Sequence, residues 1–192
     1  MNFIECYDKG LPDIICDNLV SLFEEQKHLH VNGVILGKNS SQLNQSKIKK
    51  STEIPIDSSF IDNVVWSKSV ISILDYLKIS SDKYVKKFSY LGNVADWGLY
   101  KGFNFQRYLA GEGYFKIHSE VPCKEVSDRV LTWMIYLNDV KKGGTYFDQY
   151  NLSVEAEKGK IVLWPPYWTH THKGIISKTE KKYILTGWFV FV

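Results

Sequence analysis

Arginine is almost absent from this 192-residue chain, although the chain is not poor in positive charge. Only Arg107 and Arg129 carry a guanidinium group, and lysine supplies the rest of the 24 basic side chains. A guanidinium clamp on an anion therefore has two sources at most, and any other buried anion must be held by lysine. The net charge of +3 is too small to favour nucleic acid or a membrane as the main partner.

Cysteine is also scarce, and the long apolar runs of membrane spans are missing. The cysteines at positions 6, 16 and 123 form no CxxC pair and no metal-ligand spacing, which is typical of reduced thiols in a cytosol. The N-terminus has no basic stretch followed by an apolar run, so no targeting segment is indicated. No window approaches 18 apolar residues. We therefore expect a cytoplasmic protein without a membrane partner.

The chain does have enough apolar side chains for one sizeable core, at 44% hydrophobic and 15% aromatic. The first half has a mixed pattern, with short strands predicted over residues 3–6 and 30–36 and helical periodicity over 12–26 and 60–90. The polar segment 37–50 predicts a mobile loop, either a plain surface loop or a lid over the functional site.

From about Gly98 onwards, short β-rich runs alternate with turns. The predicted strands cover residues 102–109, 114–121, 129–137, 145–147, 152–154, 160–164, 168–173 and 183–192. About eight strands without intervening helices predict a barrel or a sandwich. Since no repeat or linker divides the chain, we expect one domain over residues 1–192. Residues 1–97 would support a β core formed by residues 98–192.

Two short motifs in the β-rich half carry candidate metal ligands. His118-x-Glu120 lies on one predicted strand, and His170-x-His172 lies on another, so each pair is expected to share a face. Two histidines and one carboxylate are the ligand set of non-haem iron(II) sites, which leave coordination positions open for a co-substrate and dioxygen. Each motif alone is weak, because such pairs are usually satisfied surface residues. A similar pair, His28-x-His30, is interpreted as a solvated helix end.

Order and spacing make the two motifs more specific. His118-x-Glu120, then His172, then Lys182 ten residues later resembles the signature of 2-oxoglutarate oxygenases, and the surrounding sequence is similar to their prolyl 4-hydroxylase-like branch. The other matching motifs are Tyr108-x-x-Gly111, Arg129-x-Leu131-Thr132, Tyr136-Leu137-Asn138-Asp139, Gly143-Gly144-Thr145-x-Phe147, Lys158-Gly159 and Trp164-Pro165. The resemblance covers about residues 103–192 and, more loosely, residues 3–23.

The resemblance implies a mainly β fold of the α+β class, a double-stranded β-helix of jelly-roll or cupin-like form with N-terminal buttressing helices. It implies iron(II) on His118, Glu120 and His172, with 2-oxoglutarate and dioxygen as co-substrates. His172 is preferred over His170 because only His172 has the ten-residue spacing to Lys182.

The distal carboxylate of 2-oxoglutarate is then assigned to Lys182, with Lys181 and Lys178 as lesser candidates. No arginine follows Arg129, so a lysine must supply the buried cation. Strand alternation places residues 184, 186 and 188 on the Lys182 face. Tyr136 matches a residue that helps to bind the same carboxylate, Tyr108 matches one near the iron-chelating end, and Thr132 shares the face of Tyr136. The tyrosines could equally be core aromatics.

The activity implied is hydroxylation of an unactivated C–H bond with release of succinate and CO2, on a prolyl residue of a peptide or protein. A free amino acid remains an alternative substrate, and a cupin-like metal-binding module without oxygenase activity remains an alternative function. A nucleic-acid demethylase fits less well, because that branch relies on arginines after the distal histidine. Two departures from the prolyl hydroxylases concern Glu120, where aspartate is usual, and the short segment 121–128 that follows it.

Overall fold

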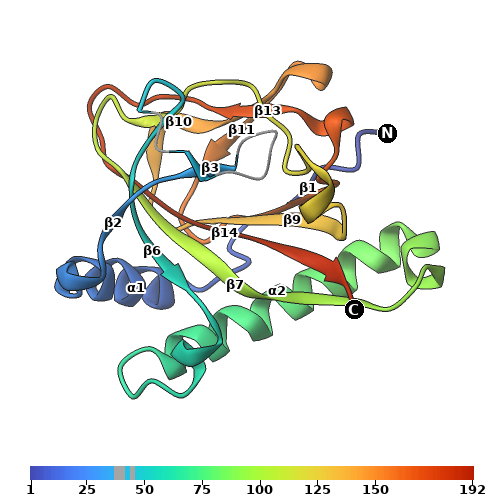
Figure 1. Ribbon diagram of the computed structural model, residues 1–192, viewed down its shortest axis with the longest axis horizontal. Helices are drawn as coiled ribbons and strands as arrows, with labels where there is room; N and C mark the ends of the chain where they lie inside the picture. The colour runs from blue at the N-terminus through green and yellow to red at the C-terminus, as the bar shows by residue number, and fades with distance from the viewer. Residues whose placement is uncertain (37–41, 44–45) are drawn as a thin grey trace.

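The protein is described here from a computed structural model, which covers residues 1–36, 42–43 and 46–192. Its largest element is an antiparallel sheet of seven strands in the order β1-β12-β9-β14-β7-β6-β2 (Figure 1). The bounds of these strands are β1 Glu5–Tyr7, β12 Ile161–Trp164, β9 Arg129–Tyr136, β14 Lys182–Phe191, β7 Trp97–Tyr108, β6 Thr52–Ile56 and β2 Val31–Asn32.

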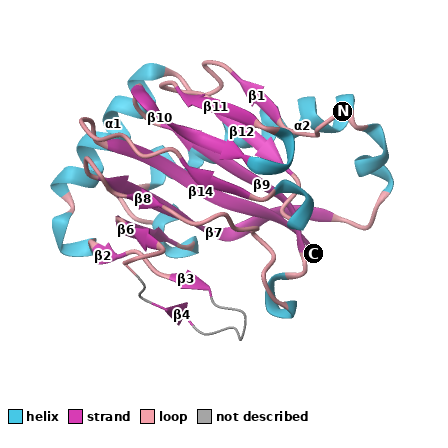
Figure 2. Cartoon of the chain, turned by 90° about the horizontal axis from the view of Figure 1, so that it is seen from above, coloured by secondary structure: helices cyan, strands magenta, loops and turns pink. Residues whose placement is uncertain are grey.

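A smaller sheet lies over one face of the large sheet (Figure 2). It has the order β11-β10-β13, formed by Leu152–Ala156, Val140–Phe147 and His172–Gly174. Two short pairs extend the structure at one end: β3 (Ile35–Leu36) with β4 (Gln42–Leu43), and β5 (Lys49–Lys50) with β8 (Gly113–Tyr114). Two facing antiparallel sheets are the arrangement expected of a double-stranded β-helix, so the predicted fold class is confirmed.

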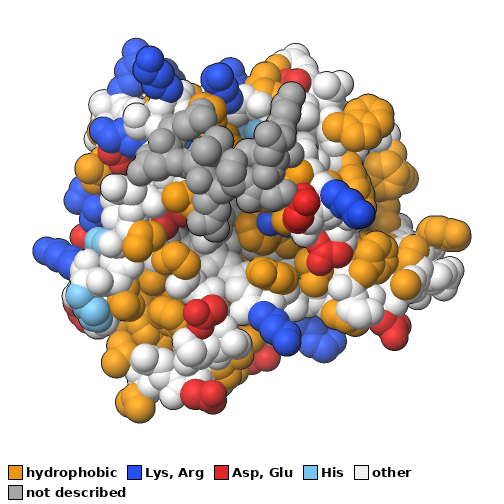
Figure 3. All heavy atoms as spheres, in the orientation of Figure 1, with side chains coloured by type: hydrophobic (Ala, Val, Ile, Leu, Met, Phe, Trp, Pro, Cys, Tyr) orange, Lys and Arg blue, Asp and Glu red, His pale blue; other side chains and the backbone are white. Residues whose placement is uncertain are grey.

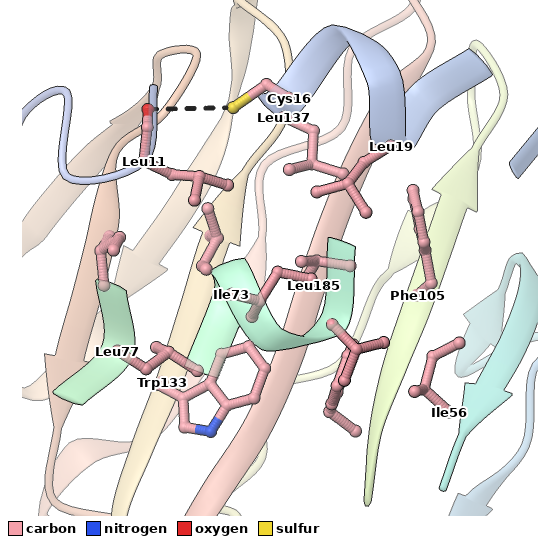
Figure 4. Close-up of a cluster of buried hydrophobic side chains, with 14 of the residues drawn as sticks. Leu11, Cys16, Leu19, Ile56, Ile73, Leu77, Phe105, Trp133, Leu137 and Leu185 are labelled. Carbon is pink, nitrogen blue, oxygen red and sulfur yellow. Dashed lines mark hydrogen bonds between the residues drawn. The ribbon is translucent and has the colours of Figure 1, made fainter. Parts of the chain in front are cut away.

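The two long helices, α1 (Asp13–Glu25) and α2 (Ser67–Lys87), cover the outer face of the large sheet (Figure 1). Strand alternation divides β9 between two cores. Trp133 and Ile135 point to the helices and belong to the same core cluster as Leu19 and Leu77. Figure 4 shows Trp133, Leu19 and Leu77 in this cluster. Met134 and Tyr136 point between the sheets. The helices therefore stabilise the sheet from behind and leave its inner face to the functional site.

The short connecting helices are all of the 3-10 type. They cover Lys27–Leu29, Ser58–Ile61, Ser89–Asn93, Lys124–Val126, Asp148–Tyr150 and Trp168–His170. The helical pattern over residues 60–90 thus resolves into one long helix with a 3-10 turn on each side. No helix within the described part of the chain is long and apolar enough to cross a membrane.

Two predicted strands are wrong in extent. Over residues 114–121 only Tyr114 belongs to a strand, and His118 makes a single bridge to His172. Over residues 168–173 a 3-10 helix precedes the strand, which begins at His172. Both segments lie where the chain bends around the open end of the β-structure, and tertiary contacts set the backbone there.

The predicted mobile loop 37–50 lies in large part outside the described residues. Its last part is described, and there the prediction from composition is wrong. Lys49 is 6% exposed, forms β5 and makes an ion pair with Glu53 at 2.5 Å. Its charge is compensated by a carboxylate that composition alone does not reveal.

Candidate active site

The structure brings His118, Glu120 and His172 together at one end of the β-structure. One ligand atom from each residue lies within 4.8 Å of the others. His118 and His172 are joined through their backbones, since each N–H donates to the carbonyl oxygen of the other at 2.9 Å. The ring nitrogens Nε2 of His172 and His118 lie 3.3 and 3.6 Å from Glu120 Oε1. This spacing allows one metal ion to contact all three side chains.

The tautomers of both histidines suit metal binding. Nδ1 of His118 lies 3.1 Å from the carbonyl oxygen of Lys116, and Nδ1 of His172 lies 3.0 Å from that of His170. Because a carbonyl can only accept, each neutral ring carries its proton on Nδ1 and presents Nε2 as the free ligand. The backbone therefore orients both rings.

The pKa shifts of His118 and Glu120 also favour metal binding at this cluster. Burial lowers the pKa of His118, and the neighbouring His172 lowers it further, so the neutral ring is favoured. Burial acts to raise the pKa of Glu120, but the neighbouring imidazoles of His118 and His172 outweigh it and hold that pKa well below its usual range. The set thus contains a neutral imidazole at His118 and a carboxylate at Glu120.

Lys182 lies in the same cavity, which has a volume of about 410 Å³. Its side chain is only 5% exposed, and Nζ donates to the carbonyl oxygens of Gly143 at 2.7 Å and Ile175 at 3.3 Å. Burial lowers the pKa of Lys182 to about 8, and within the described residues no ion pair compensates its charge. As alternation predicted, Ile184, Thr186 and Trp188 line the cavity with it.

The other predicted residues lie at different depths. Tyr108 lines the cavity, and its hydroxyl donates to Gln106 Oε1 at 2.5 Å. Tyr136 is set one layer back, where its hydroxyl contacts Thr145 Oγ1 at 2.7 Å, and Thr145 lines the cavity. Thr132 shares the face of Tyr136 but is 1% exposed, and its Oγ1 has no hydrogen-bond partner among the described residues.

Residues 103–190 match the family model of the 2OG-Fe(II) oxygenase superfamily. The chain carries a 2OG-Fe(II) oxygenase domain. The family uses iron(II), 2-oxoglutarate and dioxygen, as the resemblance implied. No curated protein matches the chain.

Solved structures of prolyl hydroxylases share the fold of this chain. The viral collagen prolyl hydroxylase of Paramecium Bursaria Chlorella virus-1, in its 2OG complex, is 17% identical with a TM-score of 0.69, covering 100% of this chain and 97% of the other. A Pseudomonas putida prolyl-4-hydroxylase is 14% identical with a TM-score of 0.68, covering 100% and 94%. A Trichoplax adhaerens prolyl hydroxylase, in complex with a hypoxia inducible factor peptide fragment, is 14% identical with a TM-score of 0.73, covering 99% and 84%.

The residues present fit the groups that a 2OG-Fe(II) oxygenase binds. His118, Glu120 and His172 offer two imidazole nitrogens and a carboxylate at a common centre, which suits iron(II). The buried and uncompensated Lys182 suits the distal carboxylate of 2-oxoglutarate. When bound, iron(II) and 2-oxoglutarate supply the activation of dioxygen and the oxidation of a C–H bond.

His170 does not share the face of His172, so the alternation argument is wrong at this motif. The 3-10 helix turns its ring away from the cluster. Its Nε2 lies 2.8 Å from the carbonyl oxygen of Asn2, and its Nδ1 lies 2.8 Å from Thr169 Oγ1. His170 is a buried residue that ties the N-terminal segment to the domain. At the other histidine pair, His30 is also less exposed than expected, because its Nε2 contacts the carbonyl oxygen of Phe23 at 2.9 Å.

Two contacts around Glu120 were not predicted from the sequence. Trp188 donates from Nε1 to Glu120 Oε2 at 3.0 Å. Arg129 lies 3.6 Å from the centre of the Trp188 ring. Arg129 is one of only two arginines in the sequence, and this rarity is a signal from which its role at the site could have been predicted.

Proposed function

We propose that this oxygenase hydroxylates a prolyl residue in a peptide or protein. His118, Glu120 and His172 would hold iron(II), and Lys182 would bind the 5-carboxylate of 2-oxoglutarate. Tyr108 and Thr145 line the same space, and Tyr136 would act through its contact with Thr145. The products besides the hydroxylated residue would be succinate and CO2.

The uncompensated charge of Lys182 carries this proposal. Two buried lysines line the cavity, but only one of them has a carboxylate partner. Lys49 is neutralised by Glu53, whereas the contacts of Lys182 with described residues are to carbonyl oxygens and to the face of the Tyr108 ring, 5.3 Å away. Burying an ammonium group without an anion is costly, so the fold is better explained if an anion completes the site. A metal-binding module without co-substrate would have no need for this cation.

The shape of the cavity favours a polypeptide substrate over a free amino acid. A second cavity of about 280 Å³ adjoins the first, and both are lined by Tyr100, Asn104 and Trp188. Beyond these shared residues, the second cavity is lined by residues 55–58 and 101–103. Figure 3 shows the face that carries β6 and β7, where hydrophobic side chains lie beside a hollow. A free amino acid would leave this extension empty.

The backbone beside this extension can contribute to binding. In β7, residues 100–102 lie between two register pairs, Leu99 with Phe189 and Phe103 with Gly187. The pairing of β6 with β7 ends at Phe103. Three residues of β7 thus oppose the single residue Trp188, which is a bulge next to the cavity. Backbone groups outside a ladder can hydrogen-bond to an extended peptide. The Trichoplax adhaerens prolyl hydroxylase is itself a complex with a hypoxia inducible factor peptide fragment.

The test is succinate formation from 2-oxoglutarate under iron(II) with matched additions. One peptide contains a central proline, a second has alanine at that position, and a third sample contains free proline. We expect the proline peptide alone to raise succinate yield and to gain one oxygen atom in mass. Stimulation by free proline alone would support the amino-acid alternative. No succinate under any addition, with iron bound, would support the metal-binding module.

A further inference from the structure

The two carboxylate oxygens of Glu120 face different partners. Oε1 points to the ring nitrogens of His172 and His118, at 3.3 and 3.6 Å. Oε2 accepts a hydrogen bond from Trp188 Nε1 at 3.0 Å. The carboxylate therefore has one oxygen towards the candidate metal position and one occupied by the protein.

Trp188 is itself held by a neighbour. The guanidinium of Arg129 lies over its ring at 3.6 Å, within the range of a cation–π contact. Arg129 also donates from Nη1 to the backbone carbonyl of Glu120, and the same nitrogen lies 3.7 Å from Oε2. One arginine thus contacts the indole, the backbone and the carboxylate of the same small cluster. The hydrogen bond between Trp188 and Glu120 therefore joins β14 to a loop with which β14 forms no described strand pairing.

Glutamate needs such support more than aspartate would. Its extra methylene adds a rotatable bond, and both carboxylate oxygens can swing towards a cation. Outer hydrogen bonds fix the orientation of metal-binding carboxylates and histidines, and losing one typically weakens metal affinity 10- to 100-fold. The histidines have their carbonyl partners at Nδ1, and Trp188 supplies the corresponding restraint for the carboxylate.

We propose that Trp188, held by Arg129, is a positioning residue that retains Glu120 Oε2 and leaves Oε1 as the single oxygen for the metal. The inference rests on the proposed role of Glu120 as a ligand. It assigns to Trp188 and Arg129 a task that exists because this chain has glutamate at the position.

Cobalt(II) titration tests the proposal without turnover, because the visible absorption of cobalt(II) reports the number and arrangement of its ligands. Trp188→Phe keeps a ring but removes the N–H donor. We expect about tenfold weaker cobalt(II) binding and a changed spectrum. In a Glu120→Asp background the shorter carboxylate no longer reaches the indole, so Trp188→Phe should change affinity less than about threefold. A merely structural role would give equal losses in both backgrounds.

Trp97→Phe is the matched control. It removes an indole donor that bonds to the Leu91 carbonyl at 3.1 Å at the start of β7, and cobalt(II) affinity should not change. Arg129→Lys keeps the charge but loses the planar stack, so it should weaken binding severalfold even if Trp188→Phe fails to fold. Wild-type affinity and spectrum in Trp188→Phe, or in Arg129→Lys if that variant alone folds, would overturn the inference. No cobalt(II) binding by the wild type would instead overturn the proposed function, and the inference with it.

Discussion

Replacing Lys182 by alanine is the sharpest test of how the co-substrate is held. The side chain is 5% exposed, and among the described residues its Nζ contacts two backbone carbonyl oxygens and the face of the Tyr108 ring. A bound carboxylate would supply the missing counter-charge in a pocket that largely excludes water. Truncating one partner of such a buried charge pair costs about 2–5 kcal/mol. At about 1.4 kcal/mol per factor of ten, the 2-oxoglutarate requirement should rise about 30-fold to several thousand-fold.

The assay is a titration of 2-oxoglutarate against succinate, with iron(II) binding measured in parallel. Iron(II) affinity should change little, because the three candidate ligands are separate from Lys182. Lys178→Ala and Lys181→Ala are controls, since both side chains are exposed, and they should behave nearly as wild type. Lys182→Arg should rescue in part if the pocket admits the wider guanidinium. Equal 2-oxoglutarate affinity in wild type and Lys182→Ala would refute the assignment.

Three further predictions follow from the site. First, because burial lowers the pKa of Lys182 to about 8, 2-oxoglutarate affinity should fall as pH rises through that value, and Lys182→Arg should abolish this dependence. The unfolded chain, with the ordinary lysine pKa, binds more protons between about pH 8 and 10.5, so the Lys182 contribution should raise the free energy of unfolding across this window, as denaturant titrations at several pH values would show. Second, His118→Ala, Glu120→Ala and His172→Ala should abolish succinate formation. His170→Ala should retain it and lose about 1 kcal/mol of stability with the bond to Asn2; a dead His170 variant beside an active His172 variant would reverse the ligand assignment. Third, manganese(II) at about 100 times its dissociation constant should raise the free energy of unfolding by about 2.7 kcal/mol, reversibly with chelator; an equal gain in His118→Ala would place the metal elsewhere.

The wall of the cavity could be predicted where the backbone is regular. β14 is a true strand, so Lys182, Ile184, Thr186 and Trp188 line one cavity as the period of two requires. The spacing to Lys182 also selected His172 over His170, which is the residue that the structure places in the cluster. In a regular strand, the position of a residue in the sequence determines which face of the sheet its side chain lies on.

The same argument fails where the chain leaves the ladders. His118 and Glu120 do lie together, but not because they alternate on a strand, since one bridge to His172 is the pairing found there. Their convergence depends on a partner 54 residues further along the chain, which no local pattern encodes. The contact of Trp188 with Glu120 has the same cause, because Arg129, Trp188 and Glu120 come from separate segments.

Buried charged residues were also not predictable from the sequence. Glu53 is 3% exposed on β6, and Lys49 is 6% exposed on β5, although lysine and glutamate are rarely buried. Proline is unfavourable inside a strand, yet β6, which contains Pro55, pairs with β7 from Thr52 to Ile56. The ion pair and the hydrogen bond from Ser51 to Glu53 make this burial tolerable, and neither is visible in a linear sequence.

The three-residue strand β1 has a consequence for solubility. It pairs with β12, whose four residues, Ile161–Trp164, are all buried. The segment before β1 is fastened by His170 at Asn2 and by the Tyr84 hydroxyl at the Phe3 carbonyl. Loss of residues 1–7 would uncover an apolar strand with unpaired backbone groups. Such an edge is a template for aggregation, so seven residues that supply none of the candidate metal ligands would decide whether the protein stays dispersed.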